Sequence, residues 1–416
     1  MKICLVTAFP PSRRGLNEYG YHIARELQRD PLLSLTVLAD ELGTSEPELP
    51  EFDVVRCWQF NALSNPTRLL QTIRECRPDV VWFNLLFSTF GDQPLAAFGG
   101  LSIPLLSRIA GFYTHVTLHH LMDNINLADA GVRFPRIYRL AGSIATRMLL
   151  GANSISVLLP AYRRTLMEKY RGENVHFRAH GILSARPEYP DFSKRGNPEH
   201  RILAFGKWGT YKRLELLMEA FDAIASAIPN SKLVIAGSDH PMTPGYVENI
   251  ARQYKGNNRV VFTGYVAEEQ IPELFSTASV LVMPYSSATG SSGVAHLACE
   301  YGVPIISADI ADFREMGDDE GIAIDFYNVG HPGSLAGRII DLLKSPERQT
   351  QMAEQNFSAA LRMTMPQIIR SYLRSFTLYQ KAKAMEPISR FRRIPGWVPS
   401  RSTIFRAAAP RWAPWM

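Results

Sequence analysis

The stretch Met283-Pro-Tyr-Ser-Ser-Ala-Thr-Gly-Ser-Ser-Gly-Val-Ala-His-Leu-Ala-Cys-Glu-Tyr-Gly-Val-Pro-Ile-Ile306 decides the fold. The apolar run 280–283 that leads into it predicts a buried parallel strand. The turn-forming segment 290–293 follows, and then a short helical pattern that Gly302 ends. A strand, a Gly/Ser loop and a helix in this order present backbone N–H groups to an anion at the carboxyl end of the strand. The same residues fit an ordinary turn between a strand and a helix, so the stretch alone leaves both interpretations open.

Strand-like and helix-like segments alternate along both halves of the chain. Apolar runs that predict strands lie at 3–6, 33–38, 80–83, 116–119 and 154–158, and again at 202–205, 233–236, 260–262, 280–283 and 322–324. Helical patterns lie between most of them, and this alternation predicts an α/β protein with a parallel, doubly wound sheet in each half. The apolar segment 95–110 contains Gly99 and Gly100, so we expect a helix plus a loop there.

The chain is expected to have two domains, because its 416 residues are too many for one hydrophobic core. The segment 183–200 is rich in Pro, Arg and Ser and lacks periodicity, which is typical of a domain boundary. The predicted parts are the Rossmann-like domains 1–183 and 184–365, a C-terminal helix 366–385 that packs back on the first domain, and a basic Trp/Pro-rich tail 386–416.

Composition indicates a cytoplasmic protein. No apolar run is long enough to span a bilayer, and residues 1–7 predict a strand and lack the pattern of a cleavable signal peptide. Cys4, Cys57, Cys76 and Cys299 are scattered, which indicates reduced thiols and neither a metal site nor a disulfide framework. The formal net charge is +6, much of it in the tail, and we expect no nucleic-acid partner.

Three side chains at predicted strand ends are candidates for chemistry. His119 ends the strand 116–119 and should face the crevice where such sheets bind ligands, where it can transfer a proton or hold a hydroxyl. Lys207 and Lys212 lie in the turn after the strand 202–205, where two ammonium groups can bracket a diphosphate. A structural histidine and a solvated basic turn would explain the same residues.

Taken together, these features resemble a GT-B glycosyltransferase, with family 4 (glycosyltransferase group 1) the nearest match. The resemblance implies two Rossmann-like domains with a crevice between them, the acceptor on 1–183 and the nucleotide-sugar donor on 184–365. In the family, the first strand of the second domain ends in a glycine and basic residues that bind the donor diphosphate, and a Phe-x-Gly-x-Val turn lies beside the nucleotide base. The positions of this chain that match the family's motifs are Gly206, Lys207 and Lys212, then Gly264 and Val266, then His119, and Gly15 in a reduced N-terminal glycine loop.

The chain departs from the family at its pair of glutamates, since the matching positions are Thr289 and Leu297. In the family one glutamate holds the ribose and the other lies beside the transferred sugar. Backbone N–H groups and hydroxyls are expected to replace them, from Gly290, Ser291, Ser292 and Gly293. Glu300 lies about one helical turn beyond Leu297, so we expect it to reach the ribose from there.

The resemblance implies a hexosyltransferase-like enzyme that takes sugar from a UDP- or GDP-linked donor. The acceptor would be a glycan or a polyprenyl-linked lipid, with retention, in cell-surface polysaccharide biosynthesis. No cofactor and no metal are expected, and the catalytic residues would be His119, Lys207 and Lys212, with the two lysines balancing the charge of the leaving diphosphate. Two alternatives stay open: a GT-B-type nucleotide-sugar epimerase, and a catalytically weak binding subunit of a glycan-assembly complex.

The tail 386–416 interleaves arginines with Trp397, Trp412 and Trp415. Tryptophans among cations are typical of the bilayer interface, so the tail predicts a peripheral contact with the inner face of the cell membrane. A tail packed against the first domain, or a disordered terminus, fits the same composition.

Overall fold

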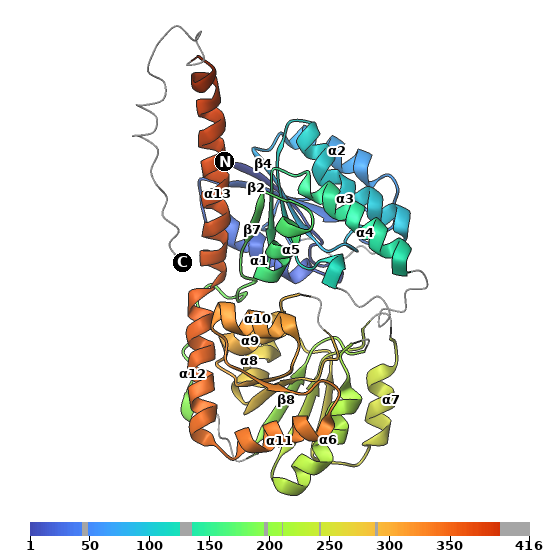
Figure 1. The fold of residues 1–416 in the computed structure, drawn as a ribbon, viewed down its shortest axis with the longest axis vertical. Helices are drawn as coiled ribbons and strands as arrows, with labels where there is room; N and C mark the ends of the chain where they lie inside the picture. The colour runs from blue at the N-terminus through green and yellow to red at the C-terminus, as the bar shows by residue number, and fades with distance from the viewer. Residues whose placement is uncertain are drawn as a thin grey trace. The chain divides into compact units, whose positions relative to one another are not determined.

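The computed structural model describes residues 1–43, 49–124, 135–194, 199–209, 211–240, 243–287 and 290–391 (Figure 1). Residues 1–369 form one compact unit that holds two parallel sheets, and residues 370–416 form a second unit. Thr289 and most of the predicted tail lie outside the described residues.

The first sheet runs in the order β3-β2-β1-β4-β5-β6-β7. Its strands are β1 (Lys2–Val6), β2 (Ser34–Asp40), β3 (Val54–Trp58), β4 (Val80–Leu85), β5 (Tyr113–Leu118), β6 (Ser154–Val157) and β7 (Val175–Phe177). Strands β4 and β5 are buried along their whole length, because helices cover both faces of a doubly wound sheet.

Within the described residues, six helical segments accompany this sheet. The segments are α1 (Asn17–Gln28), α2 (Asn65–Cys76), α3 (Pro94–Ile109), η1 (Met122–Asn124), α4 (Pro135–Leu150) and α5 (Pro160–Glu168). Three of them, α2, α3 and α4, pack side by side. Helix α3 contacts both α2 and α4 and lies between them (Figure 1). The expected loop inside 95–110 is wrong, since α3 runs through both glycines. Gly100 instead allows close packing, because a Cβ there would lie 2.3 Å from the Phe90 side chain.

The second sheet runs in the order β10-β9-β8-β11-β12-β13. Its strands are β8 (Arg201–Phe205), β9 (Lys232–Ala236), β10 (Val260–Gly264), β11 (Val280–Met283), β12 (Ile305–Ala308) and β13 (Ile324–Tyr327). The helical segments from here on are η2 (Phe192–Lys194), α6 (Leu214–Ala227), α7 (Tyr246–Gln253), η3 (Glu268–Gln270), α8 (Ile271–Ser276), α9 (Gly293–Glu300), α10 (Ala311–Glu320), α11 (Pro332–Leu343), α12 (Pro346–Arg362) and α13 (Met365–Phe391). Within the described ranges, no helix combines the length and apolar character needed to cross a bilayer.

Each sheet has one position where the strand order reverses. In the first sheet this switch point lies between β1 and β4, and in the second between β8 and β11. The loops that leave two such strands run to opposite faces of the sheet, which opens a crevice at their carboxyl ends. The predicted α/β class with two Rossmann-like sheets is therefore confirmed, and each switch point is a place to look for a ligand.

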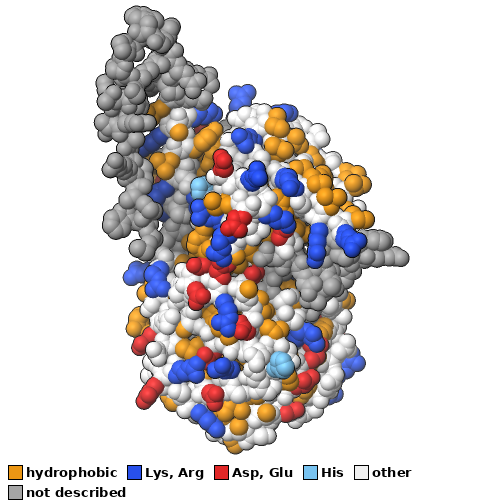
Figure 2. Space-filling view, in the orientation of Figure 1, with side chains coloured by type: hydrophobic (Ala, Val, Ile, Leu, Met, Phe, Trp, Pro, Cys, Tyr) orange, Lys and Arg blue, Asp and Glu red, His pale blue; other side chains and the backbone are white. Residues whose placement is uncertain are grey.

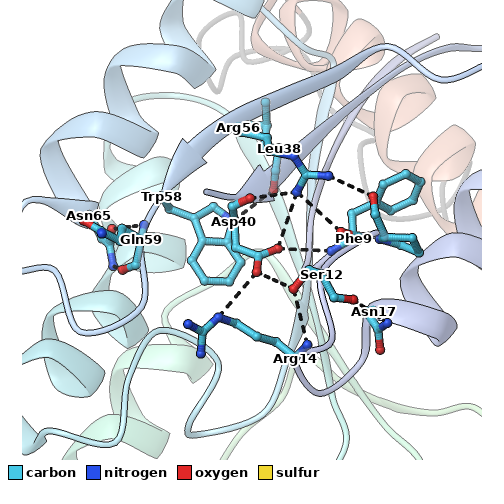
Figure 3. Close-up of polar contacts among 11 residues, drawn as sticks. Phe9, Ser12, Arg14, Asn17, Leu38, Asp40, Arg56, Trp58, Gln59 and Asn65 are labelled. Carbon is cyan, nitrogen blue, oxygen red and sulfur yellow. Dashed lines mark hydrogen bonds and ion pairs between the residues drawn. The ribbon is translucent and has the colours of Figure 1, made fainter. Parts of the chain in front are cut away.

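A buried carboxylate holds the loop that follows β1 (Figure 3). Asp40 at the end of β2 is 1% exposed and accepts hydrogen bonds from the Phe9 N–H at 3.2 Å and the Ser12 hydroxyl at 2.5 Å. Arg14 and Arg56 approach the same carboxylate at 3.5 and 3.8 Å. The guanidinium of Arg56 also donates to the carbonyl oxygen of Asp40 at 2.7 Å. The loop thus keeps one conformation without secondary structure of its own.

Replacing Asp40 with alanine should destabilise the first domain. The change leaves the Phe9 N–H and the Ser12 hydroxyl without their acceptor and removes the negative charge beside the Arg56 guanidinium, which keeps its main-chain acceptors. Breaking a buried charge pair typically costs about 3–5 kcal/mol. Thermal and urea unfolding of Asp40→Ala should show this loss. Asp222→Ala, on an exposed face of α6, is the matched control and should unfold like the wild type. Equal unfolding of both variants would show that the carboxylate does not hold the loop.

Candidate functional site

The two loops at the switch point of the second sheet are bonded to each other. The N–H of Arg213, in the loop after β8, donates to the carbonyl oxygen of Pro284 at 3.1 Å. The N–H of Ser286, in the loop after β11, donates to the carbonyl oxygen of Tyr211 at 2.8 Å. The lysine turn and the Gly/Ser stretch, which are about eighty residues apart in sequence, therefore lie side by side at one crevice.

Glycines end three neighbouring strands of this sheet. The N–H of Gly206 donates to Ala236 at 3.1 Å, and that of Gly237 donates to Gly264 at 2.8 Å. A Cβ on Gly237 would lie 1.9 Å from the carbonyl oxygen of Gly206, so only glycine fits there. Val266 follows Gly264 closely and is half-buried. Gly237 was not singled out from the sequence, although a glycine directly after a predicted strand is the signal that would have found it.

Lys212 presents a cation to the crevice. Its Nζ lies 5.1 Å from the centroid of the Tyr285 ring, and a Cβ on Gly206 would lie 2.8 Å from the same nitrogen. Burial lowers the pKa of Lys212. No carboxylate of the described residues lies within ion-pair distance of Lys212 or Lys207, and the Lys207 side chain is exposed. Burial raises the pKa of Glu18 and the charge of Lys207 opposes this shift, so Lys207 interacts with one carboxylate at longer range. Two cations without a direct ion-pair partner among the described residues are the arrangement that an anionic ligand would complete.

The start of α9 faces the same crevice, and hydrogen bonds of Ser292, His296 and Glu320 hold it in place. Ser292 caps the helix by accepting a hydrogen bond from the Ala295 N–H at 3.3 Å. The Nδ1–H of His296 donates to the Ser292 carbonyl oxygen at 2.7 Å, and its Nε2 lies 2.6 Å from Glu320. Burial opposes the charged form of His296, but the Glu320 carboxylate outweighs it and raises the pKa of the imidazole. The pair with Glu320 therefore anchors the predicted Gly/Ser loop to α10.

His119 lies at the carboxyl end of β5 in the first sheet, and it is buried. Its Nε2 lies 2.7 Å from the Asn84 amide oxygen, and the Asn84 amide nitrogen in turn donates to the Thr7 hydroxyl at 3.1 Å. This chain of bonds places the ring proton on Nε2 and leaves Nδ1 as an acceptor. Burial, followed by the neighbouring His180 and His120, holds the pKa of His119 well below its usual range, so the ring is neutral.

Aromatic rings surround His119 and extend toward α9. The Tyr19 ring lies 4.9 Å from His119 and 4.6 Å from His180, and the Tyr19 hydroxyl donates to the His180 carbonyl oxygen at 2.9 Å. The His180 ring lies 4.9 Å from that of His296. Burial lowers the pKa of His180 to about 3. No site role for Tyr19, His180 or His296 was predicted from the sequence, because only the fold brings them together.

Gly290 lies against the main chain of His119. A Cβ on Gly290 would lie 2.5 Å from the His119 carbonyl oxygen, and the φ angle of Gly290 is +108°. The N–H of Gly290 donates to Asp312 at 3.2 Å, and the Tyr162 hydroxyl donates to the same carboxylate oxygen at 2.8 Å. The histidine and the Gly/Ser loop that the sequence singled out separately are thus in contact.

The remaining predicted residues lie around this centre. Gly15 lies at the switch point of the first sheet, where a Cβ on it would be 3.1 Å from Leu86. Glu300 lines a pocket of about 340 Å³ together with Glu18, Glu268 and Leu297. Burial raises the pKa of Glu300 to about 7, although hydrogen bonds from Ser184 oppose the shift. Over the described ranges, no cluster of His, Cys, Asp and Glu is placed to hold a metal ion.

Solved structures of other proteins share the fold of these two domains. HepE of Anabaena, in complex with UDP, superposes with a TM-score of 0.68 at 16% identity, over 91% of this chain and 100% of that one. Sucrose-phosphate synthase of Thermosynechococcus elongatus superposes with a TM-score of 0.70 at 15% identity, over 92% and 99% of the two chains. The predicted GT-B fold is confirmed by these likenesses.

The second domain matches a known family. Residues 185–358 match the model of Glycosyl transferases group 1, which supports the predicted resemblance. An uncharacterized glycosyltransferase of Methanocaldococcus jannaschii is 31% identical over 139 residues, which are 33% of this chain and 34% of that protein. The chain therefore matches about one third of the length of this curated relative. The family and this relative support the prediction of an enzyme that transfers sugars.

Gly290→Ala should separate the Gly/Ser loop from His119. The added methyl group meets the His119 carbonyl oxygen and forces alanine into a left-handed conformation, and strain of this kind costs about 1–3 kcal/mol. Gly333→Ala in α11 is the control, since a Cβ there meets nothing within 4 Å. Thermal unfolding should place Gly290→Ala below the wild type and Gly333→Ala at or above it. The reverse order would contradict the contact.

Glu300 should make stability depend on pH. As pH rises from the ordinary value of 4.5 to about 7, the unfolded chain loses this proton while the folded protein keeps it, so the folded state loses stability across this window. Glu300→Gln cannot ionise, and it should therefore melt above the wild type at about pH 8, with the difference shrinking at about pH 5. Glu269→Gln, at an exposed position, is the control. A difference that stays the same at both pH values would rule out this origin.

Proposed function

We propose that this chain transfers a sugar from a nucleotide-diphosphate donor to a glycan or lipid-linked acceptor. One observation carries the proposal: Lys207, Lys212 and the start of α9 lie at the switch point of the second sheet, in the region that matches Glycosyl transferases group 1. In this proposal the domain 184–365 binds the donor, and the domain 1–183 binds the acceptor.

The diphosphate of the donor lies between the two lysines and the N-terminus of α9. The helix dipole and its unbonded first N–H groups favour negative charge at that end. Gly290, Ser291, Ser292 and Gly293 add backbone N–H and hydroxyl donors. HepE is known in complex with UDP and with UDP-glucose, which supports a donor of this kind.

The nucleoside occupies the crevice beside these groups. Gly264 and Val266 lie at the end of β10 and form the turn next to the base. Glu300 lines the neighbouring pocket, where its carboxylate accepts hydrogen bonds from ribose hydroxyls. This places an acidic side chain near the ribose, one helical turn from Leu297, where the family usually has its glutamate.

The neutral His119 orients a hydroxyl and does not act as the general base. Its Nδ1 accepts a hydrogen bond from a hydroxyl of the donor sugar or of the acceptor, while its low pKa makes it a weak base. The acceptor oxygen attacks the anomeric carbon on the face from which the diphosphate departs, so the configuration is retained. The bond from the anomeric carbon to the diphosphate oxygen breaks, its electron pair moves to the diphosphate, and the proton of the acceptor hydroxyl passes to the same leaving oxygen. Lys207 and Lys212 stabilise the charge that develops there.

The acceptor is a surface glycan or its polyprenyl-linked precursor. The basic tail 386–416 supports this class, because arginines and tryptophans together suit the inner face of a cell membrane. The reaction then belongs to cell-surface polysaccharide assembly.

Lys207→Ala and Lys212→Ala should each weaken the binding of nucleotide diphosphates. Each change removes a charged hydrogen-bond donor from the phosphates, and the expected loss is about 1.5–3 kcal/mol per variant. Calorimetric titration with UDP and with GDP measures it. Lys255→Ala, at an exposed site before β10, is the matched control and should bind like the wild type. Unchanged binding in both crevice variants would remove the donor site from this position.

Product analysis separates transfer from the alternatives. A transferase releases the nucleotide from its sugar donor and needs an acceptor for full turnover. An epimerase interconverts donor sugars without an acceptor, and a binding subunit turns over neither. Wild-type protein that binds UDP-sugars yet shows epimerisation alone, or no turnover with membrane extracts as acceptor, would contradict the proposal.

A further inference from the structure

Exposed apolar side chains gather on two neighbouring helices of the first domain. Apart from Ile109 (72% exposed) at the end of α3, these are, among the described residues, Leu95 (76% exposed) and Phe98 (36%) on α3, and Ile137 (64%), Tyr138 (37%), Leu140 (64%) and Ile144 (42%) on α4. We call these six residues the α3–α4 patch. All but Ile144 lie in the first half of their helix, and the two helices pack against each other.

The patch residues of α4 form a second apolar face of that helix. Ala145, Thr146 and Leu149 are buried and form the side that packs onto the first domain. Ile137 and Leu140 are spaced three residues apart, and Ile144 follows four later, so they share another side of the helix. Apolar residues that continue around a helix in this way, while remaining exposed, indicate a surface for another molecule.

Positive charge accompanies the patch. Arg136 and Arg139 are exposed beside it in the first half of α4, whereas Arg147 and Arg108 are exposed in the last turns of α4 and α3. Neither helix contains an aspartate or a glutamate. Figure 2 shows orange and blue side chains gathered together in the part of the molecule where Figure 1 places α2, α3 and α4. The partner of this surface must therefore accept apolar side chains and arginines at the same time.

We infer that the α3–α4 patch docks on an anionic lipid surface. A second copy of the chain would bring arginines against arginines, whereas anionic headgroups pair with them. Leucine and isoleucine on one side of an amphipathic helix enter the boundary between headgroups and acyl chains, and arginines at its edges reach the phosphates.

Docking of the patch would also fix how the crevice is oriented relative to the lipid surface. Helices α3 and α4 follow β4 and β5, so both begin at the sheet edge where β5 leads to His119. The patch thus lies toward the end of the first domain that holds the proposed acceptor side. This consequence rests on the proposed function, whereas lipid binding by the patch does not.

Sedimentation of the full-length chain with vesicles tests the inference. The vesicles are phosphatidylcholine with or without phosphatidylglycerol. Ile137→Gln with Leu140→Gln should lower the fraction bound to the anionic vesicles by about fivefold or more, and Arg136→Gln with Arg139→Gln should remove much of its salt sensitivity. Leu32→Gln with Leu361→Gln changes two other exposed leucines and should bind like the wild type. Melting temperatures near that of the wild type show that all variants fold.

Three outcomes would overturn the inference. The first is a wild-type chain that does not bind the anionic vesicles, or binds vesicles of phosphatidylcholine alone equally well. The second is loss of binding in Trp412→Ser with Trp415→Ser together with full binding by both patch variants, which assigns the contact to the tail. The third is a wild-type dimer without lipid binding that the patch variants convert to monomers. UDP binding, measured in parallel, reports on the proposed function separately.

Discussion

Main chain packs directly on main chain where β8 and β9 end, and the donor side of the crevice depends on this contact. Gly237 approaches the Gly206 carbonyl so closely that no side chain fits between them. The turn after β8 is therefore pressed against the end of the sheet, which directs Lys212 across the crevice to Tyr285. With any larger residue at position 237 the turn would have to move outward, and its lysine would move with it.

The side chains that line the crevice differ in charge between the two domains. Cations line the second domain, where Lys207 and Lys212 form no direct ion pair with a carboxylate of the described residues. Neutral imidazoles line the first, because burial keeps His119 and His180 uncharged at physiological pH. A ligand with a strongly anionic end and an uncharged, hydroxyl-rich end matches this division. A sugar joined to a diphosphate has both ends in one molecule.

The local parts of this picture could be predicted from the sequence, and the long-range parts could not. Apolar runs and turn residues located the strands and the loops around Lys212 and Gly290, because both signals are local. Tyr19, His180, Asp312 and Glu320 carry no such signal, since their partners are distant in sequence. Helix α3 was predicted as a helix plus a loop because its glycines look like turn formers, whereas Gly100 makes room for the Phe90 ring.

Both ring nitrogens of His296 are held by hydrogen bonds. One ring nitrogen is bonded to the Ser292 carbonyl and the other to Glu320, so the ring cannot turn without breaking both bonds. The backbone at the start of α9 has therefore already lost its conformational freedom before any ligand arrives. A donor that binds there need not order this segment. Its binding free energy therefore includes no entropic cost for ordering the start of α9.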